Sequence, residues 1–287
     1  MARPPKNLQN NSTGKKLTQS VLRLDGNDSA PRRCHECGMT FSPHISSDVN
    51  LHEKYHVLHL NGRKWSMKWG DIIEKYQLNR ETSEALHVNL QLIQNRGPWS
   101  LASSHTALSH DYVAQISASR KSEVMATLDI MEIVNDELKA PQNENHFWSH
   151  LYERDGISDF KGQTKPTGTA FVYVSNKRAV GVITLEYLNS RDERGRWMIY
   201  DTAGIVSNVK PSFKLGISRV WVCKQQRGRG IGTRLLEAAR KYAVPGFELE
   251  KLDMAWSQPS ESGGKLAKSY NGVVHQKSGK VLIPCYI

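Results

Sequence analysis

Apolar residues recur at helical spacing in the segment that follows Arg120. The apolar positions lie three or four residues apart: Val124, Leu128, Met131, Val134 and Leu138. Residues at this spacing share one face of an α-helix, so the segment is predicted to be an amphipathic helix whose apolar face meets a core. Pro141 is expected to end this helix, because proline cannot continue it.

The pattern after residue 168 predicts alternating strands and helices. TAFVYVSNKRAVGVITLEYL contains two β-rich runs around a turn at residues 175–178, which predicts a hairpin. RWMIYD and GISRVWVCK are predicted to be further strands, and residues 231–243 carry one apolar helix face. DMAWSQ, a short helix in GGKLAKSY and the strand VLIPCYI complete the chain. This order predicts one mixed α/β domain over residues 119–287.

The N-terminal part of the chain lacks such a pattern. Residues 1–33 are basic and contain Pro, Asn and Ser without sustained apolar periodicity, so a disordered tail is expected. Residues 34–70 form a compact unit that contains Cys and His. Residues 71–118 are expected to be a linker, because they are rich in Ser, Asn and Gln and only weakly periodic.

The tail contains a partial match to the Q-x-x-L motif that docks on sliding clamps, formed by Gln19, Leu22 and Leu24. The aromatic pair that usually ends this motif is missing. An incidental group of apolar residues is therefore the alternative interpretation.

Composition and charge narrow the classes of partner. The 287 residues are 38% hydrophobic, which is enough for one core but little for the whole length. The formal net charge of +11 favours an acidic partner such as DNA, chromatin or an acidic protein surface. No stretch approaches the roughly 18 apolar residues of a membrane span, and the polar start has no signal-peptide centre. An intracellular protein without a membrane partner is expected.

Two cysteines and two histidines have the spacing of a zinc site. Two residues separate Cys34 from Cys37, and His52 and His56 lie four apart, on one face of a helix. Four such ligands complete a tetrahedron, so a structural zinc ion is predicted; unconnected polar residues of a loop are the alternative. A zinc finger of this kind could brace the domain that follows it, bind protein or contact DNA. Three more histidines lack ligand spacing and are expected at the surface: His35, His44 and His59.

The glycine-rich stretch RGRGIGT stands between a predicted strand and a predicted helix. It lacks the third glycine of the dinucleotide fingerprint, and the chain has no GxxxxGK[ST] motif. Read as Arg227-x-x-Gly230-x-Gly232, it resembles the R/Q-x-x-G-x-G/A loop of the GNAT acetyltransferases, which holds the pyrophosphate of acetyl-CoA. Glycines let backbone amides approach phosphates, and a helix starting at Ile231 would direct its positive end toward them. An RG-type RNA contact and a plain tight turn are the alternatives.

Several segments, taken in order, resemble the cohesin acetyltransferases of eukaryotic nuclei in their fungal form. They are LHEKYHVLHLNGRKWS, RGRWMIYD, GISRVWVC, the glycine loop, AWSQPSESGGKLAKSYNG and SGKVLIPCYI. The resemblance covers roughly residues 34–70 and 120–287. It implies a GNAT fold, in which helices flank a mixed sheet, preceded by a small zinc finger. It also implies acetyl transfer from acetyl-CoA to lysines of a cohesin SMC subunit, in the nucleus and coupled to DNA replication in S phase, when sister-chromatid cohesion is established.

The resemblance also implies where acetyl-CoA would bind. The backbone of Val220, Trp221 and Val222 would hold the pantetheine arm. The glycine loop would hold the pyrophosphate through Arg227, Gly228, Arg229, Gly230, Ile231, Gly232 and Thr233.

The implied catalytic residues depart from the family at one position. Ser218 matches the family's catalytic serine, whereas Gln258 stands where many animal members have a catalytic Asp. Because glutamine cannot accept the proton, Glu261 is predicted to be the general base or to attract the lysine ammonium group, with helix capping as the alternative. Tyr270 is predicted to protonate the leaving thiolate, with packing as the alternative.

Two rival functions stay open on the sequence. The missing Asp at Gln258 would fit a catalytically weak zinc-finger chromatin adaptor with a GNAT-like domain. A GNAT enzyme that acetylates a small amine is the second rival, although neither the finger nor the basic tail would help a small substrate to bind.

Overall fold

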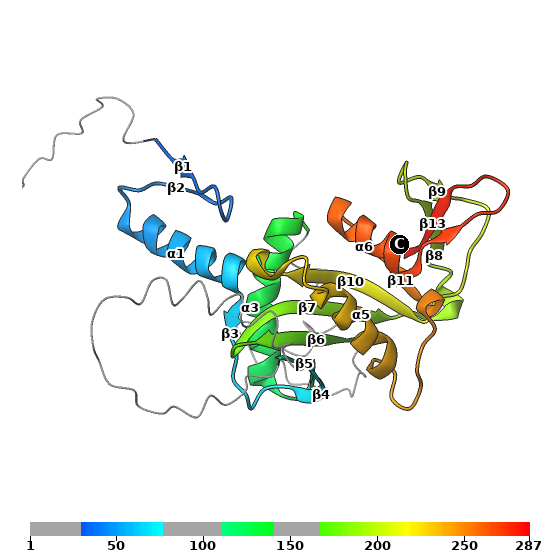
Figure 1. Cartoon of the computed structure of the whole chain (residues 1–287), viewed down its shortest axis with the longest axis horizontal. Helices are drawn as coiled ribbons and strands as arrows, with labels where there is room; N and C mark the ends of the chain where they lie inside the picture. Colours follow the sequence, from blue (N-terminus) through cyan, green and yellow to red (C-terminus); the bar gives the residue numbers. More distant parts are fainter. Residues whose placement is uncertain (1–29, 77–110, 141–166) are drawn as a thin grey trace, which may run out of the picture.

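A mixed sheet forms the centre of the protein (Figure 1). The computed structural model describes residues 30–76, 111–140 and 167–287. The main path through the sheet is β4-β5-β6-β7-β10-β11-β13-β8-β9, with β3 paired to β7 and β12 to β13. Neighbouring strands are antiparallel except for the parallel pairs β10–β11 and β11–β13. The strands are β3 (Arg63–Lys64), β4 (Asp71–Tyr76), β5 (Asp111–Ile116), β6 (Gly168–Ser175), β7 (Arg178–Tyr187), β8 (Gly195–Ile199), β9 (Ile205–Val206), β10 (Leu215–Val222), β11 (Met254–Trp256), β12 (Val273–Val274) and β13 (Val281–Tyr286).

Two helices pack on opposite faces of this sheet. On β7, Gly181 lies against Ile231 of helix α5 (Ile231–Tyr242), where an added Cβ would come within 3.0 Å of that side chain. Trp221 of β10 contacts α3 (Lys121–Leu138) and pairs across the strands with Val182, the neighbour of Gly181. Because successive strand residues point to opposite faces, α3 and α5 must lie on different sides. This confirms the predicted mixed sheet with flanking helices.

The predicted helices and the predicted hairpin are present. Helix α3 buries Val124, Met131 and Val134, and its apolar spacing accounts for that face. Asn176 and Lys177 connect β6 to β7 with φ angles of 49° and 59°, the left-handed conformation that a two-residue hairpin turn needs. Helix α6 (Glu261–Asn271) contains the predicted GGKLAKSY segment.

The linker predicted for residues 71–118 is wrong at both of its ends. Strand β4 pairs with β5, and β5 pairs with β6 along its length, so both belong to the main sheet. Val113 and Ala114 are fully buried there. The two segments are short, and the Ser- and Asn-rich sequence around them hides their strand character, which becomes stable only when the strands pair across the sheet. Residues 77–110 lie outside the described residues.

The finger unit is attached to this sheet. It consists of β1 (Arg32–Arg33), β2 (Thr40–Phe41) and α1 (Ser46–Asn61), and β3 then joins the sheet through β7. Arg178 of β7 donates from Nε to the Asn61 carbonyl oxygen at 2.8 Å. Trp65 is 4% exposed and belongs to the main core. The finger is therefore part of the same folded body.

The expected tail up to residue 29, with its clamp motif at Gln19, Leu22 and Leu24, lies outside the described residues. None of the helices in the described part of the chain combines the length and apolarity needed to cross a membrane.

Candidate active site and metal centre

The four predicted zinc ligands come together in space. One ligand atom from each of Cys34, Cys37, His52 and His56 lies within 4.8 Å of all the others. The distance from Cys34 Sγ to His56 Nδ1 is 3.4 Å. In a tetrahedral zinc site a sulfur and a nitrogen ligand lie about 3.5 Å apart, so this distance fits. His52 Nε2 is buried and has no hydrogen-bond partner, as expected for an atom whose partner is a metal ion. The donor set therefore fits zinc, as predicted.

The surroundings of Cys34 favour its metal-binding form, whereas burial raises the pKa of the Cys37 thiol. A hydrogen bond from the Cys37 backbone amide is the main reason why the pKa of the Cys34 thiol falls to about 6. The thiolate is the form that binds zinc. Outside the ligand set, Glu36 Oε2 lies 3.0 Å from His56 Nε2 and orients that ring from its other nitrogen. Phe41 stacks on His52 with ring centroids 4.0 Å apart.

Strands β10 and β11 separate at Ser218. Their parallel pairing runs from Leu215 with Met254 to Ile217 with Trp256, where β11 ends. Strand β10 continues to Val222 and pairs with β7, with an irregularity between Ile217 and Arg219. Ser218 is the extra residue of this bulge, which bends the strand. Among the described strands, none pairs with the β11 side of β10 beyond this point, so this strand edge is open, although the Val222 carbonyl oxygen there accepts from Arg227.

The glycine loop follows this exposed strand edge. Gly228 and Gly230 have φ angles of 77° and 75°, which residues with a side chain adopt only at a cost. No side chain caps α5, so the first amides of the helix keep their donors available. A Cβ at Gly232 would lie 3.1 Å from Leu266 Cδ2, so this glycine permits close packing of α5 on α6. The loop fits the diphosphate of a coenzyme A thioester.

A cavity of about 740 Å³ lies where the two strands separate. It contains two of the predicted catalytic residues, Ser218 and Gln258, together with Val220. The Ser257 hydroxyl donates to the Ser218 carbonyl oxygen at 3.0 Å, which holds the bulge beside β11. The cavity also includes residues from the end of α3, from β7, from the segment just before β8 and from the end of β13: Leu138, Glu186, Arg194 and Tyr286.

Glu186 is the acidic side chain among the described residues that line this cavity. Its carboxylate forms an ion pair with Arg194, and its side chain is 30% exposed. The neighbouring Tyr286 is buried, and burial with the nearby Glu186 carboxylate raises the pKa of its hydroxyl. A Cβ at Gly216 would lie 2.7 Å from the Tyr286 ring, so glycine is needed there to admit it. Sequence analysis missed Glu186; a lone Glu in the apolar run GVITLEY was its only signal.

Glu261 and Tyr270 lie in other surroundings. The Glu261 side chain is 87% exposed and pairs with Lys265 at 2.9 Å, which lowers the pKa of its carboxyl. Ser260 is the N-cap of α6, and Glu261 occupies the first turn of the helix. Tyr270 is buried, and burial followed by the charge of Glu237 raises the pKa of its hydroxyl. The structure therefore directs Glu261 to Lys265 and solvent, away from the cavity.

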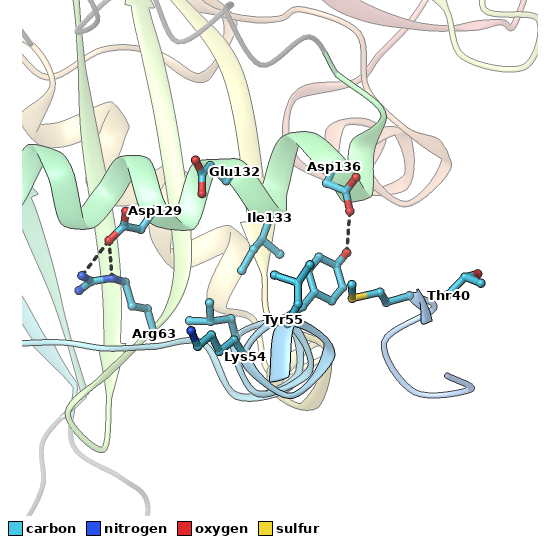
Figure 2. Close-up of a pocket in the computed structure, with 11 residues that line it drawn as sticks. Thr40, Lys54, Tyr55, Arg63, Asp129, Glu132, Ile133 and Asp136 are labelled. Atoms are coloured by element: carbon cyan, nitrogen blue, oxygen red, sulfur yellow. Dashed lines mark hydrogen bonds and ion pairs between the residues drawn. The ribbon is translucent and has the colours of Figure 1, made fainter. Parts of the chain in front are cut away.

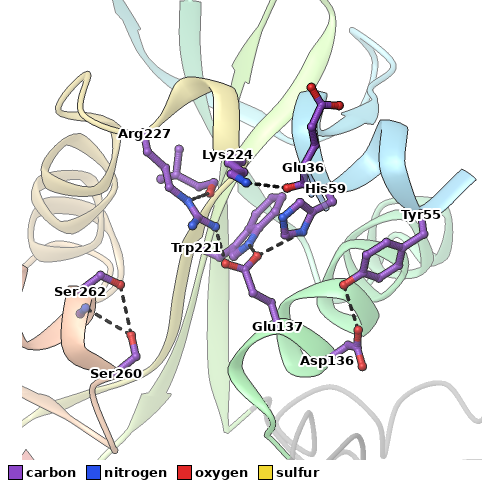
Figure 3. Close-up of polar contacts among 12 residues, drawn as sticks. Glu36, Tyr55, His59, Asp136, Glu137, Trp221, Lys224, Arg227, Ser260 and Ser262 are labelled. Carbon is purple, nitrogen blue, oxygen red and sulfur yellow. Dashed lines mark hydrogen bonds and ion pairs between the residues drawn. The ribbon is translucent and has the colours of Figure 1, made fainter. Parts of the chain in front are cut away.

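A second set of polar contacts connects the finger to the glycine loop (Figure 3). Glu137 of α3 accepts from Trp221 Nε1 at 2.7 Å and from Arg227 Nη2 at 2.5 Å. His59 of α1 is 6% exposed, and its Nδ1 lies 3.4 Å from Glu137 Oε2. The surface position expected for His59 is therefore wrong, because α1 packs beside α3 and covers it. The Arg227 guanidinium also donates to the Val222 carbonyl oxygen at 2.8 Å, so it holds the loop to the end of β10.

A separate groove of about 670 Å³ lies between α1 and α3 (Figure 2). Tyr55 donates its hydroxyl to Asp136 at 2.9 Å at one end, and Arg63 pairs with Asp129 at 2.9 Å at the other. Apolar side chains from both helices, including Leu58 and Ile133, line the space between. These contacts join the finger helix to α3 without touching the glycine loop.

Two family models match parts of the chain. Residues 19–58 match the family described as the zinc-finger of acetyl-transferase ESCO, and residues 211–278 match the family described as ESCO1/2 acetyl-transferase. N-acetyltransferase ECO1 of Kluyveromyces lactis is 46% identical over 275 residues, which are 95% of this chain and 97% of the relative. N-acetyltransferase ECO1 of Saccharomyces cerevisiae is 39% identical over 282 residues, which are 94% of this chain and 95% of the relative.

Two solved structures show more distant similarity. The xEco2 acetyltransferase domain bound to a lysine–CoA conjugate is 20% identical, with a TM-score of 0.43 over 62% of this chain and 94% of that chain. A ribosomal-protein-alanine N-acetyltransferase from Brucella melitensis is 16% identical, with a TM-score of 0.33 over 58% and 96% of the two chains.

Proposed function

The chain belongs to the ECO1/ESCO family of N-acetyltransferases, and we propose that it transfers acetyl groups from acetyl-CoA to lysines of a cohesin SMC subunit. The observation that carries the proposal is the cavity where β10 and β11 separate. The cavity extends along the strand edge that leads into the glycine loop. An extended thioester with a diphosphate at one end fits this arrangement.

Lysine acetylation requires a neutral amine. A free lysine side chain has a pKa near 10.4, so its deprotonation at pH 7 costs about 4.6 kcal/mol. Acetyl-CoA supplies an activated acyl group and a thiolate leaving group. The chain must hold the amine against the thioester carbon, polarise the carbonyl and accept the amine proton. We assign the second task to backbone amides at the open edge of β10, and Ser218, which lines the cavity at the bulge, is our candidate for orienting the amine.

Glu186 is our candidate for the acidic group that receives the lysine. Its carboxylate lines the cavity together with Ser218, whereas Glu261 is held by Lys265 outside it. The carboxylate forms an ion pair with Arg194, and we assign it to attract the incoming ammonium group and to accept its proton directly or through water. Gln258 cannot accept a proton and is assigned to hydrogen bonding with the substrate backbone.

Two features favour a macromolecular substrate. The formal net charge of +11 favours an acidic partner surface, and the finger forms one body with the catalytic domain. A small amine would need neither feature. The substrate would be met in the nucleus during S phase, and imaging of the tagged full chain through the cell cycle tests this. The clamp contact through Gln19, Leu22 and Leu24 stays a prediction, which a clamp pull-down with Gln19→Ala and Leu22→Ala tests.

Mass spectrometry of a labelled reaction tests the proposed function. The full chain is incubated with labelled acetyl-CoA and the isolated head domain of a cohesin SMC subunit, with a small polyamine in a parallel sample. Label on lysines of the head domain is expected, reduced at least about ten-fold in Ser218→Ala. Absence of label on every lysine, including those of the chain itself, would favour the chromatin adaptor. Faster labelling of the polyamine would favour the small-amine enzyme.

A further inference from the structure

We propose that Glu137 is a positioning residue that makes acetyl-CoA binding depend on the zinc-loaded finger. The proposal rests on the proposed function, because it assigns the glycine loop to acetyl-CoA. Its basis is the contact of one carboxylate with three elements: the finger helix, the cofactor strand and the glycine loop (Figure 3).

The Glu137 carboxylate is largely shielded from water. Its side chain is 23% exposed, and the partners Trp221 and His59 are 4% and 6% exposed. One oxygen accepts from Trp221 and faces His59, and the other accepts from Arg227. A largely buried carboxylate needs the hydrogen bonds from Trp221 and Arg227, because a buried charge without partners is destabilising, and the His59 ring of the finger helix lies against the same carboxylate. The position of the finger helix therefore bears on the group that holds Arg227.

A second contact joins the finger to the same loop by another route. Lys224, which lies just before the glycine loop, donates from Nζ to the Glu36 carbonyl oxygen at 2.5 Å. Glu36 is the residue whose carboxylate lies 3.0 Å from the zinc-ligand ring of His56. Thus the knuckle around the metal contacts one end of the segment from Lys224 to Arg227, and Glu137 contacts the other.

The contacts of Lys224 and Arg227 affect ligand affinity because the glycine loop beside them is intrinsically flexible. Gly228 and Gly230 give the backbone conformational freedom that must be lost when a diphosphate binds. Fixing Arg227 beforehand lowers that cost, so the loop binds its ligand more tightly when the finger is in place. By linkage, a ligand on the loop must also favour the folded finger and its zinc ion.

The contacts of the groove between α1 and α3 provide a natural control. Asp136 is the neighbour of Glu137 and also receives a hydrogen bond from the finger helix, through Tyr55 at 2.9 Å. Among the described residues Asp136 makes no contact with the glycine loop, and Figure 3 shows the Tyr55–Asp136 pair on the side of α3 away from Arg227. If any contact between the finger and the catalytic domain supported coenzyme A binding, loss of the Asp136 contact would weaken binding as much as loss of Glu137.

The test measures zinc affinity by chelator competition on the full chain, with and without saturating coenzyme A. Coupling free energies between sites usually correspond to factors of about five or more. In the wild type, coenzyme A is expected to raise zinc affinity at least about five-fold. In Glu137→Gln the factor should fall below about two, and calorimetry should show weaker coenzyme A binding. In Asp136→Asn both values should stay close to those of the wild type.

Several outcomes would overturn the inference. They are the absence of coupling in the wild type, undiminished coupling in Glu137→Gln, and tighter coenzyme A binding by that variant, which would mean that Glu137 withholds Arg227 from the phosphates. Equal losses in Asp136→Asn would also contradict it. If Glu137→Gln does not fold, Lys224→Gln removes the second contact from an exposed position and must reduce the coupling. Failure of the wild type to bind coenzyme A would refute the proposed function as well, whereas binding without coupling refutes this inference alone.

Discussion

Ser257 donates its hydroxyl to the carbonyl oxygen of Ser218 at 3.0 Å, at the bulge where β10 and β11 separate. The bond joins the two strands at the last point where they are close. Beyond it the strand edge is open, so the same residues define the end of the pairing and the start of the cavity.

Substitution of Gly230, which has a left-handed backbone conformation, is expected to weaken cofactor binding. In Gly230→Ala the backbone would be strained by about 1–2 kcal/mol, and the new Cβ would project into the space assigned to the diphosphate. Calorimetry should show at least about ten-fold weaker coenzyme A binding. Gly246→Ala is the matched control, since φ is also 75° and its surroundings are also open. It should lose similar stability and keep its affinity; equal affinity losses would contradict the assignment.

Exchange of the cavity carboxylate tests its role in catalysis. Glu186→Gln keeps the shape of the side chain but removes the proton acceptor, so kcat should fall at least about ten-fold in a steady-state lysine acetylation assay. Glu261→Gln should change kcat less than about two-fold, because that side chain is exposed and paired with Lys265. The reverse order would restore Glu261 as the base. A thermal melt of each variant separates lost chemistry from lost folding.

Loss of one zinc ligand should affect both metal content and stability. His52→Ala removes the buried Nε2 atom from the ligand set, so the bound zinc measured by atomic emission should fall well below one ion per chain. The melting temperature should fall with it, because α1 packs on α3. His44→Ala changes an exposed histidine outside the set and should keep full zinc content. Full zinc in His52→Ala would refute the site.

A pH-dependent contribution to stability is expected from Glu237. Burial alone would raise the pKa of this carboxyl, but hydrogen bonds led by Arg240 outweigh it and lower the pKa. A lowered pKa means that the stabilisation is present above the carboxyl's ordinary pKa and is lost as the pH falls through the native value. Urea unfolding should show Glu237→Gln less stable than the wild type by about 1–2 kcal/mol at pH 7, with the difference shrinking toward pH 3.

Glu248 offers the control for that measurement. It also pairs with Arg240, at 2.7 Å, but its side chain is 58% exposed. Glu248→Gln should change the free energy of unfolding by less than about 0.5 kcal/mol at both pH values, because exposed ion pairs contribute little. If Glu237→Gln is less stable than the wild type by the same amount at both pH values, the lost stability comes from packing and not from the charge of Glu237.

Local patterns in the sequence were sufficient for much of the fold. The helical spacing from Val124 to Leu138, the hairpin around residues 175–178 and the ligand spacing of the finger each follow from periodicities of 3.6, of 2 or of metal geometry. The glycine loop could be located as well, because a few adjacent residues determine both its left-handed φ angles and the uncapped start of the helix. These features depend on neighbours in the chain.

The features that only the tertiary structure reveals are contacts between residues far apart in the sequence. Strands β4 and β5 become stable only through pairing with each other and with β6, so their short segments looked like a linker. Glu186 and Ser218 line the same cavity because β7 and β10 are adjacent, and Glu137 contacts His59 and Arg227 because three elements converge there. By itself the sequence determined the family, the metal ligands and the place of the glycine loop before its helix. Packing alone decided that Glu186 lines the cavity and that Glu137 joins the finger to the loop. The local periodicity of a sequence does not determine which distant elements come into contact.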